Sequence, residues 1–313
     1  MDKRQQLESI LNRRIMVLDG AMGTMLQQMG LFELTAGQAG SCELLTLTHP
    51  NAVADVHRQY LTAGADIITT NTFCANAATM GSSAAIVELN RYAAAIARRE
   101  ANGFSTASKP RFVAGSMGPT TPMLSLLCTE ERAQAAAQLL AAYVQQAIAL
   151  IEGGVDLLLL ETATDVANVQ VAMEAIANAQ HRLQISVPVM VSATVGQQGT
   201  LPSGQNLAAL IEAIAPHKLL SVGLNCSLGV EHIVSHLAEL ARLASCYVSA
   251  HPNAGLPNAQ GQYAQTPEQI AGCLSSPMNR GLLNIVGGCC GTTPAHIARI
   301  AQVAALCKPR RIG

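Results

Sequence analysis

The sequence predicts an α/β protein of the (β/α)8 (TIM) barrel class, a single domain spanning residues 1–313. Half of the residues are hydrophobic and only 12% are charged, so a chain of this length can bury one large core. Eight short, almost continuous apolar runs alternate with helical patterns, which is typical of parallel strands buried on both faces. A closed barrel is the simplest arrangement of these elements, and an open doubly wound sheet is the alternative.

The predicted elements follow one another regularly. Residues 2–13 form an amphipathic helix with Leu7, Ile10 and Leu11 on one stripe, and we expect it to close one end of the barrel. A helix is expected over residues 48–63, with Thr48 as its N-cap and Pro50 in its first turn. The predicted strands span residues 15–18, 66–70, 112–114, 155–160, 188–192, 220–224, 246–249 and 283–286. Longer polar loops at residues 32–47, 119–129, 196–206 and 253–266 should surround one face.

Polar residues and cysteines gather where the predicted strands end. In both sheet topologies the active site lies at the carboxyl ends of the strands, so these side chains should converge on one face. The residues at these ends are Asp19, Asn71, Ser116, Glu161, Asn225, Cys226, Asn253, Cys289 and Cys290.

Three of the nine cysteines occupy strand ends in a pattern that suits a metal. Cys289 and Cys290 are adjacent, between two glycines and a Thr-Pro helix start, and Cys226 ends another apolar run. A zinc ion with three protein ligands keeps a fourth position open, whereas structural zinc sites are closed by four ligands and often use C-x2-C pairs, which are absent here. Only the folded barrel could bring these three thiols together, which favours a catalytic zinc site.

The alternative is that these cysteines are buried structural residues without a metal. We adopt that interpretation for the remaining cysteines, because free cysteine commonly behaves as a small buried hydrophobic residue. They are Cys42, Cys74, Cys128, Cys246, Cys273 and Cys307.

Three thiolates on zinc predict a particular chemistry. They leave a net negative charge, which weakens activation of water and keeps a bound substrate thiolate electron-rich. Zinc also lowers the pKa of a bound thiol, so the thiolate persists at neutral pH and can attack an activated methyl group. The hypothesis is therefore alkylation of a substrate thiol.

With these residues in place, the sequence resembles the zinc-dependent homocysteine S-methyltransferases, and most closely the N-terminal homocysteine-binding module of cobalamin-dependent methionine synthase. The resemblance runs almost from end to end. It rests on residues 17–24 (VLDGAMGT), 223–227 (GLNCS), 251–257 (HPNAGLP) and 287–294 (GGCCGTTP). It implies a barrel with catalytic zinc held by Cys226, Cys289 and Cys290.

The resemblance also implies roles for other strand-end residues. Asn253 matches an exchangeable fourth zinc ligand, although turn formation in His-Pro-Asn-Ala-Gly explains it equally well. Glu161 matches the acid that binds the homocysteine amino group, and an exposed loop acid is its alternative. Asp19 with Gly20 matches the end of the family's first strand, where backbone and side chain help to hold the amino-acid end of the substrate, and a plain turn aspartate is the alternative.

Ser116, Asn225, Asn71 and Thr70 are further candidates for hydrogen bonds to the substrate carboxylate or to the cysteine ligands, with ordinary capping of strand ends as the alternative. His251 is more typical of a satisfied loop histidine than of a metal ligand.

The implied reaction is methyl transfer to L-homocysteine, giving methionine. The favoured donor is methylcobalamin, linked to methyltetrahydrofolate and supplied by a separate corrinoid or methylfolate-binding protein. The corrinoid signature Asp-x-His-x-x-Gly is absent. Asp55-Val56-His57 matches its beginning, but Tyr60 occupies the position of the required glycine. The alternative donors are S-methylmethionine, S-adenosylmethionine and betaine.

Two other function classes remain as alternatives. One is a non-catalytic subunit that binds zinc and homocysteine, and intact Asp19, Glu161 and cysteines argue against it. The other is a barrel aldolase or decarboxylase, which would need a strand-end lysine or a phosphate-binding glycine loop. No lysine lies at a predicted strand end, so methyl transfer is favoured.

Charge and hydropathy restrict the partners. A net charge of −1 offers no electrostatic basis for binding nucleic acid or an anionic membrane. The N-terminal residues 1–14 are charged and polar, and we expect no apolar run of bilayer-spanning length. These features and the odd number of cysteines predict a cytoplasmic protein with reduced thiols.

Overall fold

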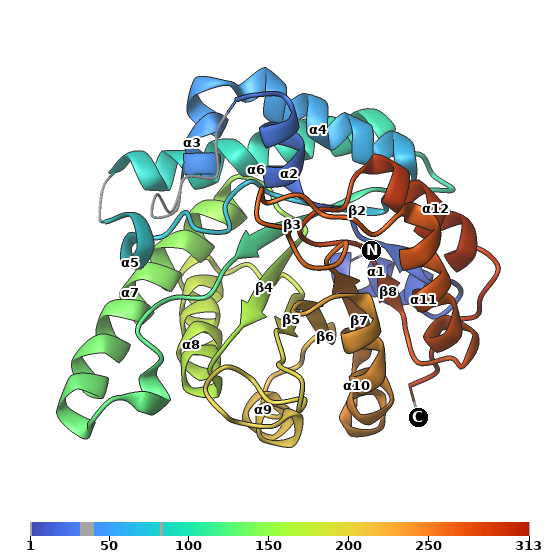
Figure 1. The fold of residues 1–313 in the computed structure, drawn as a ribbon. Helices are drawn as coiled ribbons and strands as arrows, with labels where there is room; N and C mark the ends of the chain where they lie inside the picture. Colours follow the sequence, from blue (N-terminus) through green and yellow to red (C-terminus); the bar gives the residue numbers. More distant parts are fainter. Residues whose placement is uncertain (1, 32–40, 82–83, 313) are drawn as a thin grey trace.

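A ring of helices surrounds a barrel of eight parallel strands (Figure 1). The computed structural model describes residues 2–31, 41–81 and 84–312. The strands are β1 (Met16–Val17), β2 (Ile67–Thr69), β3 (Phe112–Met117), β4 (Leu157–Ala163), β5 (Val189–Ala193), β6 (Ser221–Cys226), β7 (Tyr247–Pro252) and β8 (Ile285–Val286). They are hydrogen-bonded in the order β1-β8-β7-β6-β5-β4-β3-β2, and a parallel bridge between Leu18 and Ile67 joins β1 to β2. The predicted (β/α)8 barrel is confirmed.

The helices cover the outside of the barrel and close its ends. The α-helices are α1 (Lys3–Leu11), α2 (Met22–Gln28), α3 (Ser41–Thr48), α4 (Pro50–Ala63), α5 (Ala77–Met80), α6 (Ala84–Phe104), α7 (Thr129–Glu152), α8 (Val166–Leu183), α9 (Leu207–Ile214), α10 (Val230–Leu243), α11 (Pro267–Asn279) and α12 (Pro294–Ala304). One 3-10 helix, η1, spans Leu124–Leu126.

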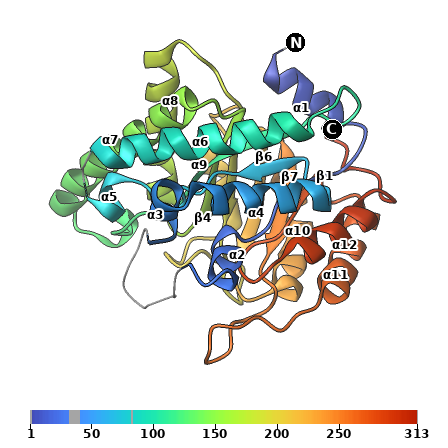
Figure 2. The same ribbon diagram turned by 90° about the horizontal axis from the view of Figure 1, so that it is seen from above.

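Helix α1 packs against the interior of the barrel. Leu7, Ile10 and Leu11 belong to one buried cluster with inward-facing strand residues such as Phe112 and Tyr247. The opposite faces of the strands pack against the outer helices. Figure 2 shows α1 at one end of the barrel and α2, with the loop before α11, at the other. The predicted closure of one end by the N-terminal helix is confirmed.

Several strands continue beyond their predicted ends. Glu161 lies within β4, Asn225 and Cys226 lie within β6, and His251 lies within β7. Their backbones remain in the ladder, since Asn225 pairs with His251 in register. A polar residue after an apolar run predicts the end of a strand. In a barrel, however, a polar side chain at the carboxyl end of a strand can point into the interior while its backbone stays in the ladder.

The region before α4 also differs from the prediction. Thr48 is the last residue of α3, where its hydroxyl donates to Leu44 O at 3.3 Å, and His49 is the N-cap of α4. The prediction of Thr48 as N-cap is therefore wrong. Residues 41–47, expected to be loop, form most of α3, and residues 32–40 of that loop lie outside the described residues. The short helix α2 was not predicted.

Helix α7 is the one described helix long and apolar enough to cross a membrane by length and composition. The expectation that no such run exists is therefore wrong for α7. Half of the most apolar stretch of α7 is buried inside the protein, and α7 packs closely against α6 and α8. This burial is typical of a core helix, which passes the same test.

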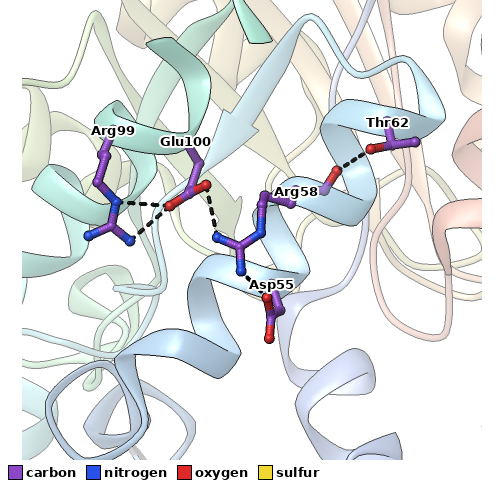
Figure 3. A network of polar contacts seen from close by, with 5 residues as sticks. All are labelled: Asp55, Arg58, Thr62, Arg99 and Glu100. Carbon is purple, nitrogen blue, oxygen red and sulfur yellow. Dashed lines mark hydrogen bonds and ion pairs between the residues drawn. The ribbon is translucent and has the colours of Figure 1, made fainter. Parts of the chain in front are cut away.

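A network of charged side chains joins α4 to α6 on the outside of the barrel (Figure 3). Arg58 of α4 donates to Glu100 Oε2 of α6 at 3.0 Å and also pairs with Asp55. Arg99 donates from Nε to Glu100 Oε1 at 2.9 Å. Such partly exposed ion pairs contribute little individually, so burial of the α4 and α6 apolar faces dominates the packing.

Candidate active site

Three thiols from two strand ends form a compact cluster. Cys226 ends β6, and Cys289 and Cys290 follow β8. The three Sγ atoms lie within 4.8 Å of one another, and the Cys289 and Cys290 sulfurs are 4.0 Å apart. It is the single group of three or more cysteine, histidine or acidic side chains in the described ranges that could hold a metal ion. The six other cysteines are outside this group, as expected, but the prediction that they are buried is wrong, because five are partly exposed and Cys128 is exposed.

Unusual backbone conformations present these thiols. Cys226 has φ 59° and Ser227 has φ 69°, two consecutive non-glycine residues in the left-handed region. This conformation costs free energy and is often found where the surrounding structure serves a site. The backbone N–H of Cys289 donates to Pro252 O at 2.8 Å, which attaches the second part of the cluster to β7.

The glycines before the cysteines allow a close approach of two chain segments. A Cβ on Gly287 would lie 2.7 Å from Leu18 Cβ, and one on Gly288 would lie 2.3 Å from Thr292 Oγ1. The Gly288 N–H donates to Asp19 O at 3.0 Å. A side chain at Gly287 would push the end of β8 away from the end of β1, and one at Gly288 would collide with Thr292 in the following turn.

The thiols share one readily formed negative charge. Hydrogen bonds from the Cys289 and Cys290 thiols hold the pKa of Cys226 well below its usual range. Because the Cys289 and Cys290 thiols donate hydrogen bonds to Cys226 and are buried, their own pKa values are raised. Ionising all three sulfurs therefore requires a positive charge between them, which a divalent cation supplies. The donor set fits a thiophilic metal such as zinc.

Asn225 connects the cluster to β4. Its Nδ2 lies 3.8 Å from Cys289 Sγ and donates to Thr162 Oγ1 at 2.8 Å, while its Oδ1 accepts from Thr162 N at 2.9 Å. Asn225 is fully buried. The structure therefore brings this predicted site residue next to a sulfur, where it orients the thiol.

Asn253 lies on the other side of Cys226. Its Nδ2 donates to Ser227 O at 3.0 Å, and its side chain also hydrogen-bonds to Cys226 and so lowers the pKa of that thiol. Its Oδ1 is buried and has no hydrogen-bond partner in the described structure. An unpartnered buried amide oxygen costs free energy, and a ligand or ion nearby would remove that cost.

Two acids lie close to the cluster. Glu161 Oε1 accepts a hydrogen bond from Ser116 Oγ at 2.5 Å. Asp19 is 2% exposed and accepts from Thr69 N at 2.8 Å and from Thr69 Oγ1 at 3.1 Å.

Burial is the first cause of the raised pKa of both acids, bringing that of Glu161 to about 7 and holding that of Asp19 well above its usual range. Repulsion between the two carboxylates contributes to the shift of Asp19. Within the described part of the chain neither acid has a cationic partner, so an ammonium group bound there would favour both carboxylates.

The remaining candidates have structural contacts. A Cβ on Gly20 would lie 2.7 Å from Thr292 Oγ1, so this glycine allows the end of β1 to approach residue 292. Asn71 donates to Cys42 O at 2.9 Å and to Thr46 Oγ1, and so supports α3 instead of the cluster. His251 is buried with a pKa lowered to about 4 and lies outside the thiol group, as expected. It is a strand residue whose buried Nε2 has no hydrogen-bond partner in the described ranges, so the interpretation as a satisfied loop histidine is wrong.

Tyr263 was not identified from the sequence. Its side chain hydrogen-bonds to Cys290, and a Cβ on Gly291 would lie 2.1 Å from its ring. Gly291 has φ 79°, a conformation that favours glycine. Tyr263 is the one aromatic residue in the loop of residues 253–266, a signal that could have marked it.

A model of the family described as homocysteine S-methyltransferase matches residues 16–304. The chain belongs to the homocysteine S-methyltransferase family. The predicted family resemblance is therefore confirmed. The protein is an enzyme of this family, whose members methylate homocysteine.

Solved structures share the fold of this homocysteine S-methyltransferase. The metallated form of the homocysteine methyltransferase MmuM from Escherichia coli is similar at a TM-score of 0.74 and 21% identity, over 96% of this chain and 99% of that chain. Its oxidized form is similar at a TM-score of 0.75 and 22% identity, over 95% and 98% of the two chains. At this identity the likeness concerns the barrel.

Proposed function

We propose that this protein transfers a methyl group to the thiol of L-homocysteine, producing methionine, with a zinc ion held by Cys226, Cys289 and Cys290. The observation that carries the proposal is the approach of three Sγ atoms to within 4.8 Å at the carboxyl ends of the strands. Three sulfur ligands would leave a fourth position for the substrate. Zinc bound there would lower the pKa of the homocysteine thiol and keep it a thiolate at neutral pH.

The protein would bind the amino-acid end of homocysteine through Glu161 and Asp19. Buried carboxyl groups with raised pKa values gain from a bound ammonium group, which favours their charged forms. Ser116 would hold the Glu161 carboxylate through its 2.5 Å hydrogen bond, and the Gly20 backbone would contribute at the end of β1. These contacts would aim the substrate thiol at the cluster.

Asn225 and Asn253 would act on the cluster itself. The Nδ2 of Asn225, 3.8 Å from the Cys289 sulfur, would orient that thiolate. Asn253 is proposed as the exchangeable fourth ligand that homocysteine displaces, and its buried, unpartnered Oδ1 supports this role.

The proposed donor is a methylcorrinoid such as methylcobalamin. A separate corrinoid or methylfolate-binding protein would supply it, with methyltetrahydrofolate as the linked methyl source. The support is the similarity of residues 227–229 and 251–257 to the methionine synthase form. Direct use of S-methylmethionine, S-adenosylmethionine or betaine is the second candidate. We propose that residues 1–313 form one homocysteine-binding barrel domain and that it acts in the cytoplasm.

Metal analysis with donor trials tests the proposal. Protein purified without added metal is analysed for zinc, then given homocysteine with methylcobalamin, S-methylmethionine, S-adenosylmethionine or betaine separately. About one zinc per chain and turnover with one donor is the expected result. Zinc without turnover on any of them favours the non-catalytic binding subunit or a missing corrinoid protein. Absence of zinc from reduced protein overturns the proposed site.

A further inference from the structure

A cavity lies at the amino-terminal end of the barrel, at the opposite end from the thiol cluster. It has a volume of about 340 Å³ and lies between α1, the end of α6 and the starts of β3 and β4. Figure 2 shows α1 at this end of the molecule. Its polar lining includes Lys3, Arg98, Asn102, Ser105, Arg111 and Asp156.

Three cations and one carboxylate line this cavity. Asp156 is already used, because it accepts from Val113 N at 2.9 Å, pairs with Lys3 Nζ at 2.8 Å and pairs with Arg98. Arg111 has no carboxylate partner within residues 2–31, 41–81 and 84–312, and its guanidinium donates to Ala65 O. The cavity therefore carries an excess of positive charge in a chain whose net charge is −1.

The guanidinium groups also have unused donors. The Nε atoms of Arg98 and Arg111 are both buried, and neither has a hydrogen-bond partner in the described structure. Because these two N–H groups are screened from solvent, an anion in the cavity would have to bind the terminal guanidinium nitrogens, which pair well with carboxylate or phosphate oxygens.

Two further cations and one carboxylate lie near Arg111, outside the lining of the cavity. Lys109 and Arg14 lie close enough to Arg111 to interact with it electrostatically, and Arg14 pairs with Asp66 at 2.6 Å. Burial is the first cause of the lowered pKa of both Arg111 and Lys109, the nearby Asp66 carboxylate opposes it, and the positive charge of Arg14 adds to it. An anion placed between these side chains would reduce their repulsion.

We propose that this cavity is a binding site for a phosphate-class oxyanion, separate from the methyl-transfer site. Lys3, Arg98 and Arg111 would supply the charge, with Asn102 and Ser105 as neutral hydrogen-bonding groups. A metal cation is disfavoured because the single carboxylate is already paired with two cations. A volume of about 340 Å³ fits a small phosphorylated molecule better than a polymer.

Titration of the full-length protein with inorganic phosphate and pyrophosphate tests this site. Thermal unfolding and calorimetry are compared at equal ionic strength, set with sodium chloride, and citrate serves as a carboxylate probe. We expect saturable stabilisation by phosphate or pyrophosphate at one site per chain. Lys3→Gln and Arg111→Gln should each weaken binding at least tenfold. Cys289→Ser should bind as the wild type does, because the two sites are at opposite ends.

Arg99→Gln is the matched control. Arg99 neighbours Arg98 on the same helix, but its side chain is 61% exposed and pairs with Glu100, which keeps Arg58 as a partner (Figure 3). This variant should bind phosphate normally. If Arg111→Gln does not fold, Lys3→Gln and Arg111→Lys decide, since the Lys3 side chain is 51% exposed. Equal stabilisation by chloride, preference for citrate alone, or wild-type binding by the Lys3 and Arg111 variants would each overturn the proposal.

Discussion

Asn225 binds Thr162 through both ends of its side-chain amide, accepting from Thr162 N at 2.9 Å and donating to Thr162 Oγ1 at 2.8 Å. Thr162 has φ 57°, an uncommon conformation for a β-branched residue. The pair joins β4 to β6 between Glu161, the acid proposed to bind the substrate, and Cys226, the first thiol. One asparagine therefore stabilises a strained backbone and sets the spacing of the two halves of the site.

Replacing Asn225 tests this connection. Asn225→Ala removes both hydrogen bonds and leaves the Thr162 N–H unpaired, so the free energy of unfolding should fall by about 1–3 kcal/mol. Urea denaturation measures the change. Asn51→Ala, at an exposed position near the start of α4, should stay within about 0.5 kcal/mol of the wild type. Equal stability of the Asn225 and Asn51 variants would show that the pairing of Asn225 with Thr162 contributes nothing to the free energy of unfolding.

Cys289→Ser should abolish stoichiometric zinc binding and methyl transfer while leaving the fold intact. The thiol lies at the carboxyl end of the strands, outside the two hydrophobic clusters. Elemental analysis, activity and far-ultraviolet circular dichroism measure the three properties. Cys307→Ser, a cysteine outside the cluster, is the control and should keep about one zinc per chain. A fully active, metal-free Cys289 variant would refute the zinc assignment.

Glu161→Gln should chiefly weaken homocysteine binding. Loss of a charge-assisted hydrogen bond to the substrate ammonium costs about 1.5–3 kcal/mol, which corresponds to roughly a 10- to 150-fold higher Kd. Calorimetric titration with homocysteine measures it, and zinc content should not change. Glu174→Gln, on the exposed face of α8, is the control. An unchanged Kd in the Glu161 variant would remove this acid from the site.

Acid should destabilise the protein through His57. This histidine is fully buried on α4, neither ring nitrogen has a partner among the described residues, and burial lowers its pKa to about 4. In the unfolded chain the pKa is about 6.5, so the unfolded state binds the proton first. The stabilising contribution is complete above pH 6.5 and is lost as the pH falls towards 4, amounting to about 3 kcal/mol in total.

The comparison that isolates this effect is His57→Leu. The loss of unfolding free energy between pH 7 and 4.5 should be smaller in the variant than in the wild type by about 2–3 kcal/mol, because all other titrating groups contribute to both. Urea denaturation at the two pH values gives the difference. Parallel pH dependence of the two proteins would exclude His57 as the cause.

The amino-acid sequence is sufficient to predict the class of fold and the candidate site residues. Apolar runs such as residues 155–160 can be satisfied only between two packed layers, so the order of strands and helices follows from local hydrophobicity. The Cys289-Cys290 pair between glycines is also a local pattern, and Glu161 and Asp19 were recognisable because each follows an apolar run. Local signals of this kind identify which residues gather at one face.

How these residues meet depends on strand register and on packing between layers. The register of β6 on β7 keeps Asn225 and Cys226 in the ladder, and the pairing of β7 with β8 brings Cys289 and Cys290 to Cys226. The pairing of Asn225 with Thr162, the contact of Tyr263 with Gly291 and the basic cavity under β3 join residues far apart in the chain. Such contacts depend on strand register and packing between layers, which local hydrophobic periodicity does not specify.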